Sequence, residues 1–185
     1  MADIDRRPGS APRSGAGEKS GDFWALNRDT GAQVWNTKVG PGGLTAGLQW
    51  GSSTDGTRIY AAESNSTGLQ RGYWAALDPA TGGVLWQRPD PSPGLGFPGL
   101  FGYSLQGPVA SANGVVYGCS LDPSGTMTAM NAATGAVLWT YASGSSCLGG
   151  AAIADGTVYW GTGYRTFGPL TTPGNRLFAF TPNGL

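Results

Sequence analysis

The stretch Ala-Leu-Asp-Pro-Ala-Thr-Gly-Gly-Val-Leu-Trp at residues 76–86 decides how this chain folds, because closely similar stretches occur twice more. Residues 25–35 read Ala-Leu-Asn-Arg-Asp-Thr-Gly-Ala-Gln-Val-Trp, and residues 129–139 read Ala-Met-Asn-Ala-Ala-Thr-Gly-Ala-Val-Leu-Trp. An incomplete fourth copy starts at Ala179-Phe180. The tryptophans that end the three complete copies are 51 and 53 residues apart. Such a period is typical of propeller and solenoid architectures.

A second signal lies between the copies of this motif. Asp55-Gly56, Asn113-Gly114 and Asp155-Gly156 each precede a short run of β-branched and aromatic residues. Asp-Gly and Asn-Gly suit the positive φ angles of tight hairpin turns, and the runs that follow read as strands. Each repeat therefore holds two hairpins, which is the four-stranded content of one propeller blade.

The motif itself is predicted to be structural. Its Asp or Asn can accept hydrogen bonds from the backbone two residues on, and its Gly can adopt a left-handed conformation. The tryptophan then lies on the outer strand, where its ring can pack against the neighbouring blade. We therefore expect Trp35, Trp86 and Trp139 to be packing residues.

The fold predicted from these signals is all-β, a partial β-propeller of three to four four-stranded antiparallel blades. Closed propellers have about 4 to 8 blades, so this chain is expected to be part of a longer protein or a truncated gene product. Residues 18–185 are predicted to form the partial propeller. Residues 1–17 show no strand alternation and are expected to be a disordered or non-native leader.

Composition excludes several classes of function. Eleven basic and eleven acidic residues cancel, and no basic patch indicates nucleic-acid binding. The sequence contains no histidine, so histidine-based triads and histidine metal sites are excluded, and no other metal motif is recognised. It has no apolar run long enough for a membrane span and no signal peptide. The two cysteines, Cys119 and Cys147, are expected to be buried free thiols, with a disulfide as the alternative in an oxidising compartment.

The repeat motif and several of the segments between its copies resemble a known protein family. The three motif copies are similar to the pyrroloquinoline-quinone (PQQ) propeller repeat of quinoprotein alcohol dehydrogenases and of noncatalytic propellers of outer-membrane protein assembly. Residues 40–43, 47–60 and 156–164 are closer to polyvinyl-alcohol dehydrogenase-like proteins. The resemblance covers residues 17–185.

The resemblance implies an eight-bladed ring that holds PQQ and a divalent cation, usually Ca²⁺, near its axis and oxidises an alcohol. PQQ would accept the hydride, the cation would polarise its carbonyl, and an Asp would act as base. The partners implied are an alcohol substrate and the remaining blades of the parent protein. The implied location is periplasmic or secreted.

Three residues are candidate cofactor ligands by this resemblance. Lys19, within Gly-Glu-Lys-Ser-Gly at residues 17–21, looks like the family's lysine that contacts the quinone oxygens. Gln49 and Trp50 lie where the dehydrogenases have Asn-Trp, so Gln49 adds a methylene at the amide donor. Two of these residues have an alternative interpretation: Lys19 is then a solvated surface lysine and Trp50 a packing residue. Glu63, a carboxylate next to a predicted strand, is expected to be solvated.

Departures from the family leave two functions open. The adjacent-cysteine disulfide, the haem motif and recognisable metal-ligand and base segments are absent from this chain. They would lie upstream, and the catalytic residues are unknown. The chain is thus expected to be a fragment of a PQQ-dependent dehydrogenase that binds no cofactor and is inactive alone. The alternative is a noncatalytic propeller module that binds protein or polymer.

Overall fold

The computed structural model describes residues 2–3, 12–65, 71–94, 104–165 and 168–182. Its strands form four antiparallel sheets, and within each sheet the strands are neighbours in chain order. The first sheet contains β1 (Ala2–Asp3), β2 (Arg13–Gly17), β3 (Asp22–Asn27) and β4 (Gln33–Lys38). The second contains β5 (Ser53–Thr54), β6 (Ile59–Glu63), β7 (Tyr73–Leu77) and β8 (Val84–Pro89).

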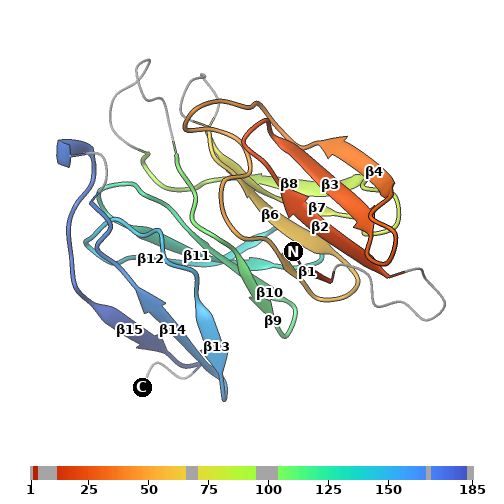
Figure 1. Ribbon diagram of the computed structural model, residues 1–185. Coiled ribbons are helices and arrows are strands. Elements are labelled where there is room, and N and C mark those ends of the chain that lie inside the picture. Colours follow the sequence, from red (N-terminus) through yellow and green to blue (C-terminus); the bar gives the residue numbers. More distant parts are fainter. Residues whose placement is uncertain (1, 4–11, 66–70, 95–103, 166–167, 183–185) are drawn as a thin grey trace.

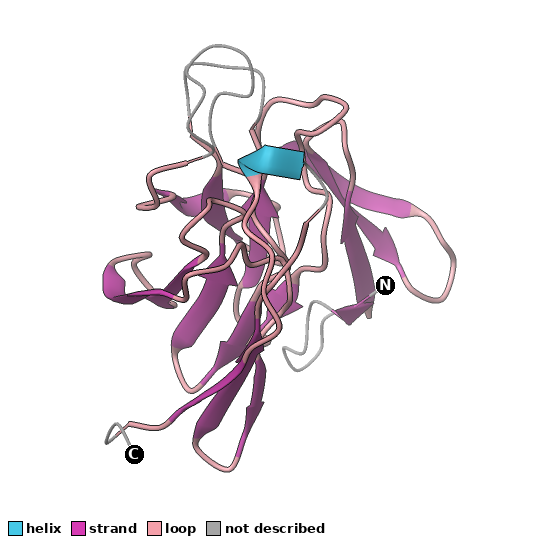
Figure 2. Cartoon of the chain, turned by 90° about the vertical axis from the view of Figure 1, so that its left-hand side faces the viewer, coloured by secondary structure: helices cyan, strands magenta, loops and turns pink. Residues whose placement is uncertain are grey.

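The third sheet contains β9 (Ala110–Ala112), β10 (Val115–Cys119), β11 (Thr126–Asn131) and β12 (Val137–Ala142). The fourth has three described strands, β13 (Ala152–Ala154), β14 (Thr157–Gly161) and β15 (Leu177–Phe180). In the described part of the chain the one helical element is the 3₁₀ turn Gly168–Leu170. It is the cyan segment of Figure 2.

The four sheets follow one another in space as they do in the sequence (Figure 1). The first sheet lies on one side of the molecule, and the fourth lies on the opposite side. This succession of small antiparallel sheets is a series of propeller blades. The prediction of an all-β partial propeller is confirmed, with three four-stranded blades and one in which three strands are described.

The motif turn joins the third and fourth strands of a blade, as predicted. In the second blade, Asp78 Oδ1 accepts hydrogen bonds from the backbone amides of Ala80 (2.6 Å) and Thr81 (3.1 Å). The Thr81 hydroxyl accepts one from the Gly83 amide, and Gly82 has a φ of +75°. Asn27 and Asn131 make the same pairs of bonds in the first and third blades. The same residue types occur in each turn because the Asp or Asn accepts two backbone amides, the Thr accepts a third, and the Gly adopts the positive φ angle.

A β-bulge follows the motif alanine in the first three blades. In the second blade Ala76 pairs with Trp86, whereas the next residue, Leu77, pairs with Val84. Leu85 is therefore left without an opposite residue and is 50% exposed. Because bulges increase local twist, this recurring irregularity helps to set the outer edge of each blade.

The motif tryptophans join successive blades. The indole N–H of Trp35 donates to the backbone oxygen of Pro79 at 3.1 Å, and that of Trp86 donates to Ala132 at 3.0 Å. Both acceptors lie in the motif turn of the following blade. The predicted packing role of these two tryptophans is confirmed. Trp139 is 37% exposed and stacks on Tyr141, and its ring also contacts Phe180 of the fourth blade edge-on, with the ring centroids 5.0 Å apart.

The hydrophobic core is divided into layers between the blades. One layer places Phe23 and Trp35 of the first blade against Ile59 and Leu77 of the second. The next layers lie between the second and third blades and between the third and fourth. A central strand such as β6 is consequently buried on both faces, and all five of its residues are buried.

The expected leader at residues 1–17 needs correction. Arg13–Gly17 form strand β2 and pair with β3, so ordered structure begins before Glu18. Ser14 and Gly15 are buried despite lacking the β-branched side chains typical of strands. Their small size lets the sheet pack closely, which is why strand propensity failed here. Residues 4–11 lie outside the described part of the chain.

Candidate functional site

The candidate cofactor ligands lie at the end of the blades where the second strand stops. Lys19 lies two residues after the end of β2 and is exposed. Its Nζ donates a hydrogen bond to the backbone oxygen of Leu44 at 3.0 Å. Leu44 belongs to the segment that connects the first blade to the second, so the lysine is tied to that connection.

The connection between β4 and β5 packs on the backbone around Lys19. The Gly43 amide donates to the Lys19 oxygen and the Leu48 amide donates to the Glu18 oxygen, both at 3.0 Å. Gly47 has a φ of +85°, and a Cβ there would lie 2.4 Å from the Lys19 oxygen. This close approach requires glycine at position 47.

Gln49 and Trp50 continue this connection immediately after Leu48. Gln49 is half-buried and Trp50 is 40% exposed, so packing does not account for the whole Trp50 ring. The structure thus brings the segments that carry Lys19, Gln49 and Trp50 together, although Lys19 and Gln49 are 30 residues apart. Trp160 is fully buried and donates its indole N–H to the Gly149 oxygen at 2.7 Å, so it is a packing residue.

Sequence reasoning missed Glu63, which was expected to be solvated. Glu63 ends β6, is fully buried, and neither carboxyl oxygen has a hydrogen-bond partner in the described structure. Burial raises the pKa of this carboxyl from 4.5 to about 8, and the positive charge of Lys38 opposes this rise only weakly. No sequence signal marked this burial, because it depends on the neighbouring blades that cover β6 on both faces.

The surroundings of Glu63 belong to the same connection that carries Gln49. A Cβ on Gly40 would lie 2.7 Å from the Glu63 side chain and 2.2 Å from the Tyr73 hydroxyl. That hydroxyl donates to the Val39 oxygen at 2.6 Å, and burial raises its pKa to about 12. Tyr73 is therefore neutral at physiological pH, and the carboxyl lies beside neutral groups.

A buried polar belt continues from blade to blade at this end of the sheets. Isolated bridges pair Gly47 with Ser64, Asn65 with Ser104, and Gln106 with Ser120. The buried Asp90 accepts bonds from the Ser92 amide (2.9 Å), the Ser92 hydroxyl (2.7 Å) and the Gln106 side-chain amide (3.0 Å). Burial nevertheless raises the pKa of Asp90. These bonds hold the interblade connections in place.

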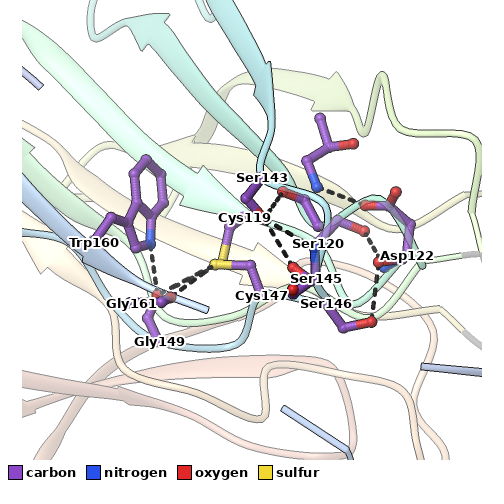
Figure 3. The surroundings of a disulfide bond; sticks show 12 residues. Cys119, Ser120, Asp122, Ser143, Ser145, Ser146, Cys147, Gly149, Trp160 and Gly161 are labelled. Atoms are coloured by element: carbon purple, nitrogen blue, oxygen red, sulfur yellow. Dashed lines mark hydrogen bonds between the residues drawn. A yellow bond between two sulfur atoms is a disulfide. The ribbon is translucent and has the colours of Figure 1, made fainter. Parts of the chain in front are cut away.

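Cys119 and Cys147 form a disulfide, so the expectation of free thiols is wrong (Figure 3). Cys119 ends β10 and Cys147 lies in the connection to the fourth blade, with a Cα–Cα distance of 5.7 Å. The apolar surroundings that suggested free thiols are real, since both residues are fully buried. Their pairing depends on an interblade contact that the spacing of the cysteines does not encode.

The donor groups of the site suit an anionic quinone better than a metal ion. Lys19 supplies an exposed cation, Gln49 an amide and Trp50 a partly exposed aromatic ring. Among the described residues, no group of three or more His, Cys, Asp or Glu side chains could hold a metal ion. An exposed cation, an amide donor and an aromatic ring are groups that can contact an anionic planar ligand, and the described residues offer no carboxylate cluster for a cation such as Ca²⁺. None of its described helices is long and apolar enough to cross a membrane.

Known proteins share both the sequence and the fold of this chain. Polyvinylalcohol dehydrogenase of Sphingopyxis sp. (strain 113P3) is 29% identical over 91% of the chain. The chain spans 30% of the length of that relative.

Two solved structures share the fold at lower identity. BamB from Moraxella catarrhalis superposes with a TM-score of 0.63 and 18% identity, over 97% of this chain and 45% of that one. Quinohemoprotein alcohol dehydrogenase from Comamonas testosteroni gives 0.66 and 16%, over 93% and 32%. Residues 70–181, more than half of the chain, match the family described as outer membrane protein assembly factor BamB, whose repeats are of the PQQ type. The chain therefore belongs to this family of PQQ-type β-propeller repeats.

Proposed function

We propose that this chain forms part of the cofactor-binding face of a PQQ-dependent alcohol dehydrogenase of the polyvinyl-alcohol type. The observation that carries the proposal is the meeting of the Lys19 segment with the connection bearing Gln49 and Trp50. The 29% identity to polyvinylalcohol dehydrogenase, which extends over 91% of the chain, supports it. Since the chain spans 30% of that relative, the activity would belong to a larger propeller.

Each of the three residues has a distinct role in this proposal. The Lys19 ammonium would stabilise negative charge on a quinone oxygen, and the Gln49 amide would donate a hydrogen bond to the same ligand. The exposed part of the Trp50 ring would offer an apolar surface to a planar group. PQQ, when bound, supplies the hydride acceptor for alcohol oxidation. The catalytic base and the Ca²⁺ ligands of the complete enzyme would belong to its other blades.

The proposed partners are further propeller blades and an alcohol, and the proposed location is the periplasm or the cell exterior. The propeller segment would comprise residues 18–185 and strand β2. It would pack against further blades of the same propeller, and the complete propeller would bind an alcohol substrate. The buried Cys119–Cys147 disulfide and the quinoprotein relatives support a periplasmic or secreted location, because structural disulfides persist in oxidising compartments.

Binding of PQQ to the isolated chain can be mapped by NMR. We expect affinity no tighter than about millimolar, because most ligands of a complete site would lie outside this chain. At millimolar PQQ, backbone signals of Lys19, Gln49 and Trp50 should nevertheless shift. The substitution Lys19→Ala should abolish the shifts.

Lys38 provides a matched control for this experiment. It is the only other lysine of the chain and its side chain is 58% exposed. Lys38→Ala removes a bond to the Ser20 oxygen beside Lys19 but leaves the Lys19 ammonium in place, so the PQQ shifts should persist. Shifts that are centred elsewhere, or that survive Lys19→Ala, would refute the proposed cofactor face. Micromolar affinity would show that the chain carries a far more complete site than proposed.

A noncatalytic binding module is the second candidate. It is favoured by the family description as outer membrane protein assembly factor BamB and by the lack of a metal-ligand group among the described residues. This function predicts no localised response to PQQ, so the same NMR experiment distinguishes the two candidates.

A further inference from the structure

The end of β6 is bonded to the connection between β4 and β5. The Gly47 amide donates to the Ser64 oxygen at 2.9 Å, and the Ser64 amide donates to the Gly47 oxygen at 3.0 Å. This pair of bonds comes directly after Glu63, the last residue of β6. The connection also packs on the turn at residues 18–21, which carries the lysine of the candidate cofactor face. It therefore links the buried carboxyl to that face.

Gly40 brings the connection into direct contact with the Glu63 carboxyl. A Cβ built on Gly40 would lie 2.7 Å from the carboxyl carbon, so only a bare backbone fits against it. The amides of Val39 and Gly40 both donate to the Gly21 oxygen, at 2.8 and 3.3 Å. Two consecutive residues thus contact the carboxyl and hold the end of the turn that carries Lys19.

The surroundings of the Glu63 carboxyl offer it no charge to pair with. Residues 39–52 of the connection contain no titratable side chain. In the described structure the titratable groups that face the carboxyl are Tyr73 of β7 and Lys38 of β4. Tyr73 is neutral, because burial raises its pKa to about 12. The Lys38 ammonium is 58% exposed and already lies 3.3 Å from Asp22 Oδ2. Neither group neutralises an ionised Glu63.

Ionisation of Glu63 is therefore incompatible with the packing of the connection. A buried charge without a partner must gain water or a counter-charge. Both carboxyl oxygens lack a partner in the described structure, and the backbone at Gly40 lies next to them. Hydration of the carboxylate requires the connection to separate from β6. That movement also breaks the bonds between the connection and the turn at residues 18–21.

We propose that Glu63 is a positioning residue for the candidate cofactor face: its neutral carboxyl lets the connection close on β6, and ionisation releases the connection. After release, Lys19, Gln49 and Trp50 no longer lie together for one ligand. The inference rests on the proposed function, because it takes these three residues to be cofactor ligands. It predicts that the face comes apart in alkaline solution.

Carbon-detected NMR of the 185-residue chain without PQQ tests the coupling first. The carboxyl carbon of Glu63 and the carbonyl carbons of Lys19, Gly40 and Gly47 should shift together, with a midpoint near the carboxyl pKa of about 8. In Glu63→Gln the three backbone signals should lose this titration, because the amide cannot ionise.

Asp90→Asn is the matched control. Asp90 is a second buried carboxyl whose pKa burial raises, and it lies in the next connection, between β8 and β9. Its substitution should leave the titration of the Lys19 and Gly40 signals unchanged. Loss of that titration in Asp90→Asn would assign the coupling to Asp90 and overturn the role of Glu63.

Binding of PQQ then reports on the assembled face. If only the chain with neutral Glu63 binds, the apparent Kd should rise about tenfold between about pH 6 and about pH 9, since about nine-tenths of the chain is then ionised at the higher pH. Glu63→Gln should bind PQQ at both pH values and show no such rise. A loss of packing alone would weaken binding at both pH values.

Three further results would overturn the assignment. One is a titration of the Lys19 and Gly40 signals that persists in Glu63→Gln. Another is a Glu63 carboxyl that titrates near its ordinary value of 4.5. The third is localised PQQ binding with the same pH dependence in the wild type and in Glu63→Gln. Absence of localised PQQ shifts at both pH values would refute the proposed function instead, and the titration without PQQ would still decide the role of Glu63.

Discussion

At the scale of single residues, Glu63 has the least expected surroundings. Glu63 and Glu18 occupy the same position of the repeat, three residues after Tyr60 and Gly15, which pair with the motif alanines Ala76 and Ala25. Glu18 is exposed, and its pKa is lowered by a hydrogen bond from Ser20, whereas burial raises the pKa of Glu63 to about 8. The difference follows from what covers each position and not from the residue type.

The raised pKa of Glu63 makes stability depend on pH. The folded chain keeps the proton up to about pH 8, but the unfolded chain releases it near pH 4.5. The stabilisation is therefore complete below pH 4.5 and is lost progressively as pH rises to about 8. Urea midpoints measured from about pH 5 to about pH 9 should show this contribution in the wild type.

Two variants separate Glu63 from the other carboxylates. Glu63→Gln should reduce the decline between about pH 5 and about pH 8, because the amide cannot ionise, and the buried Asp90, whose pKa burial also raises, should account for part of what remains. Glu18→Gln should leave the decline as it is. An unchanged slope in Glu63→Gln would mean that the carboxyl is not held neutral in the folded chain.

The sequence predicts residues of this kind poorly. Lys19, Gln49 and Trp50 could be selected by resemblance, and their segments do meet in the structure. The burial of Glu63 could not be predicted, because a strand covered on both faces requires knowledge of its neighbouring blades. The Cys119–Cys147 bond was missed for the same reason.

At the scale of elements, the motif turn and the outer-strand tryptophan act as one unit. The turn could be predicted in detail because its hydrogen bonds are local: Asp78, Thr81 and Gly82 each satisfy groups within a few residues. The acceptor of the Trp86 indole, Ala132, lies 46 residues away and needed the blade order. The β-bulges were not predicted at all, since nothing in the motif marks the residue left unpaired.

Substitution of Trp86 tests this unit. Trp86→Phe keeps an aromatic ring over Gly135 but removes the indole donor, leaving the buried Ala132 oxygen without it. We expect a loss of about 1–3 kcal/mol in the free energy of unfolding, measured by urea denaturation.

Trp139 offers the comparison within the same chain. No hydrogen bond of its indole is found among the described residues, and the side chain is 37% exposed. Trp139→Phe should therefore cost less than about 0.5 kcal/mol. Equal losses in the two variants would contradict the role assigned to the interblade bond.

At the scale of the whole molecule, stability is shared between layers that join consecutive blades. The blade order and the all-β class could be predicted from the repeat, because the repeat fixes both strand count and spacing. The disulfide and the polar belt that accompany the layers involve connections whose sequences do not repeat, so they could be found only in the structure.

The disulfide should contribute measurably to this shared stability. It joins the end of β10 to the connection that leads into the fourth blade, and its cysteines are 28 residues apart. Reduction, or the double substitution of Cys119 and Cys147 by Ser, should lower the free energy of unfolding by about 2–4 kcal/mol. Denaturation with and without reductant measures the effect, and coincident curves for fully reduced and oxidised protein would exclude it.

The tryptophan of one blade covers the motif turn of the next, and no described residue covers the turn of the first blade in this way. Hydrogen exchange at Gly31, Gly82 and Gly135 tests it most directly. Their amides donate equivalent bonds of 2.8 Å to Asn27, Asp78 and Asn131. With local bonding matched, Gly82 and Gly135 should exchange at least about tenfold more slowly than Gly31, because an indole covers them. Equal exchange rates at the three glycines would contradict the claim.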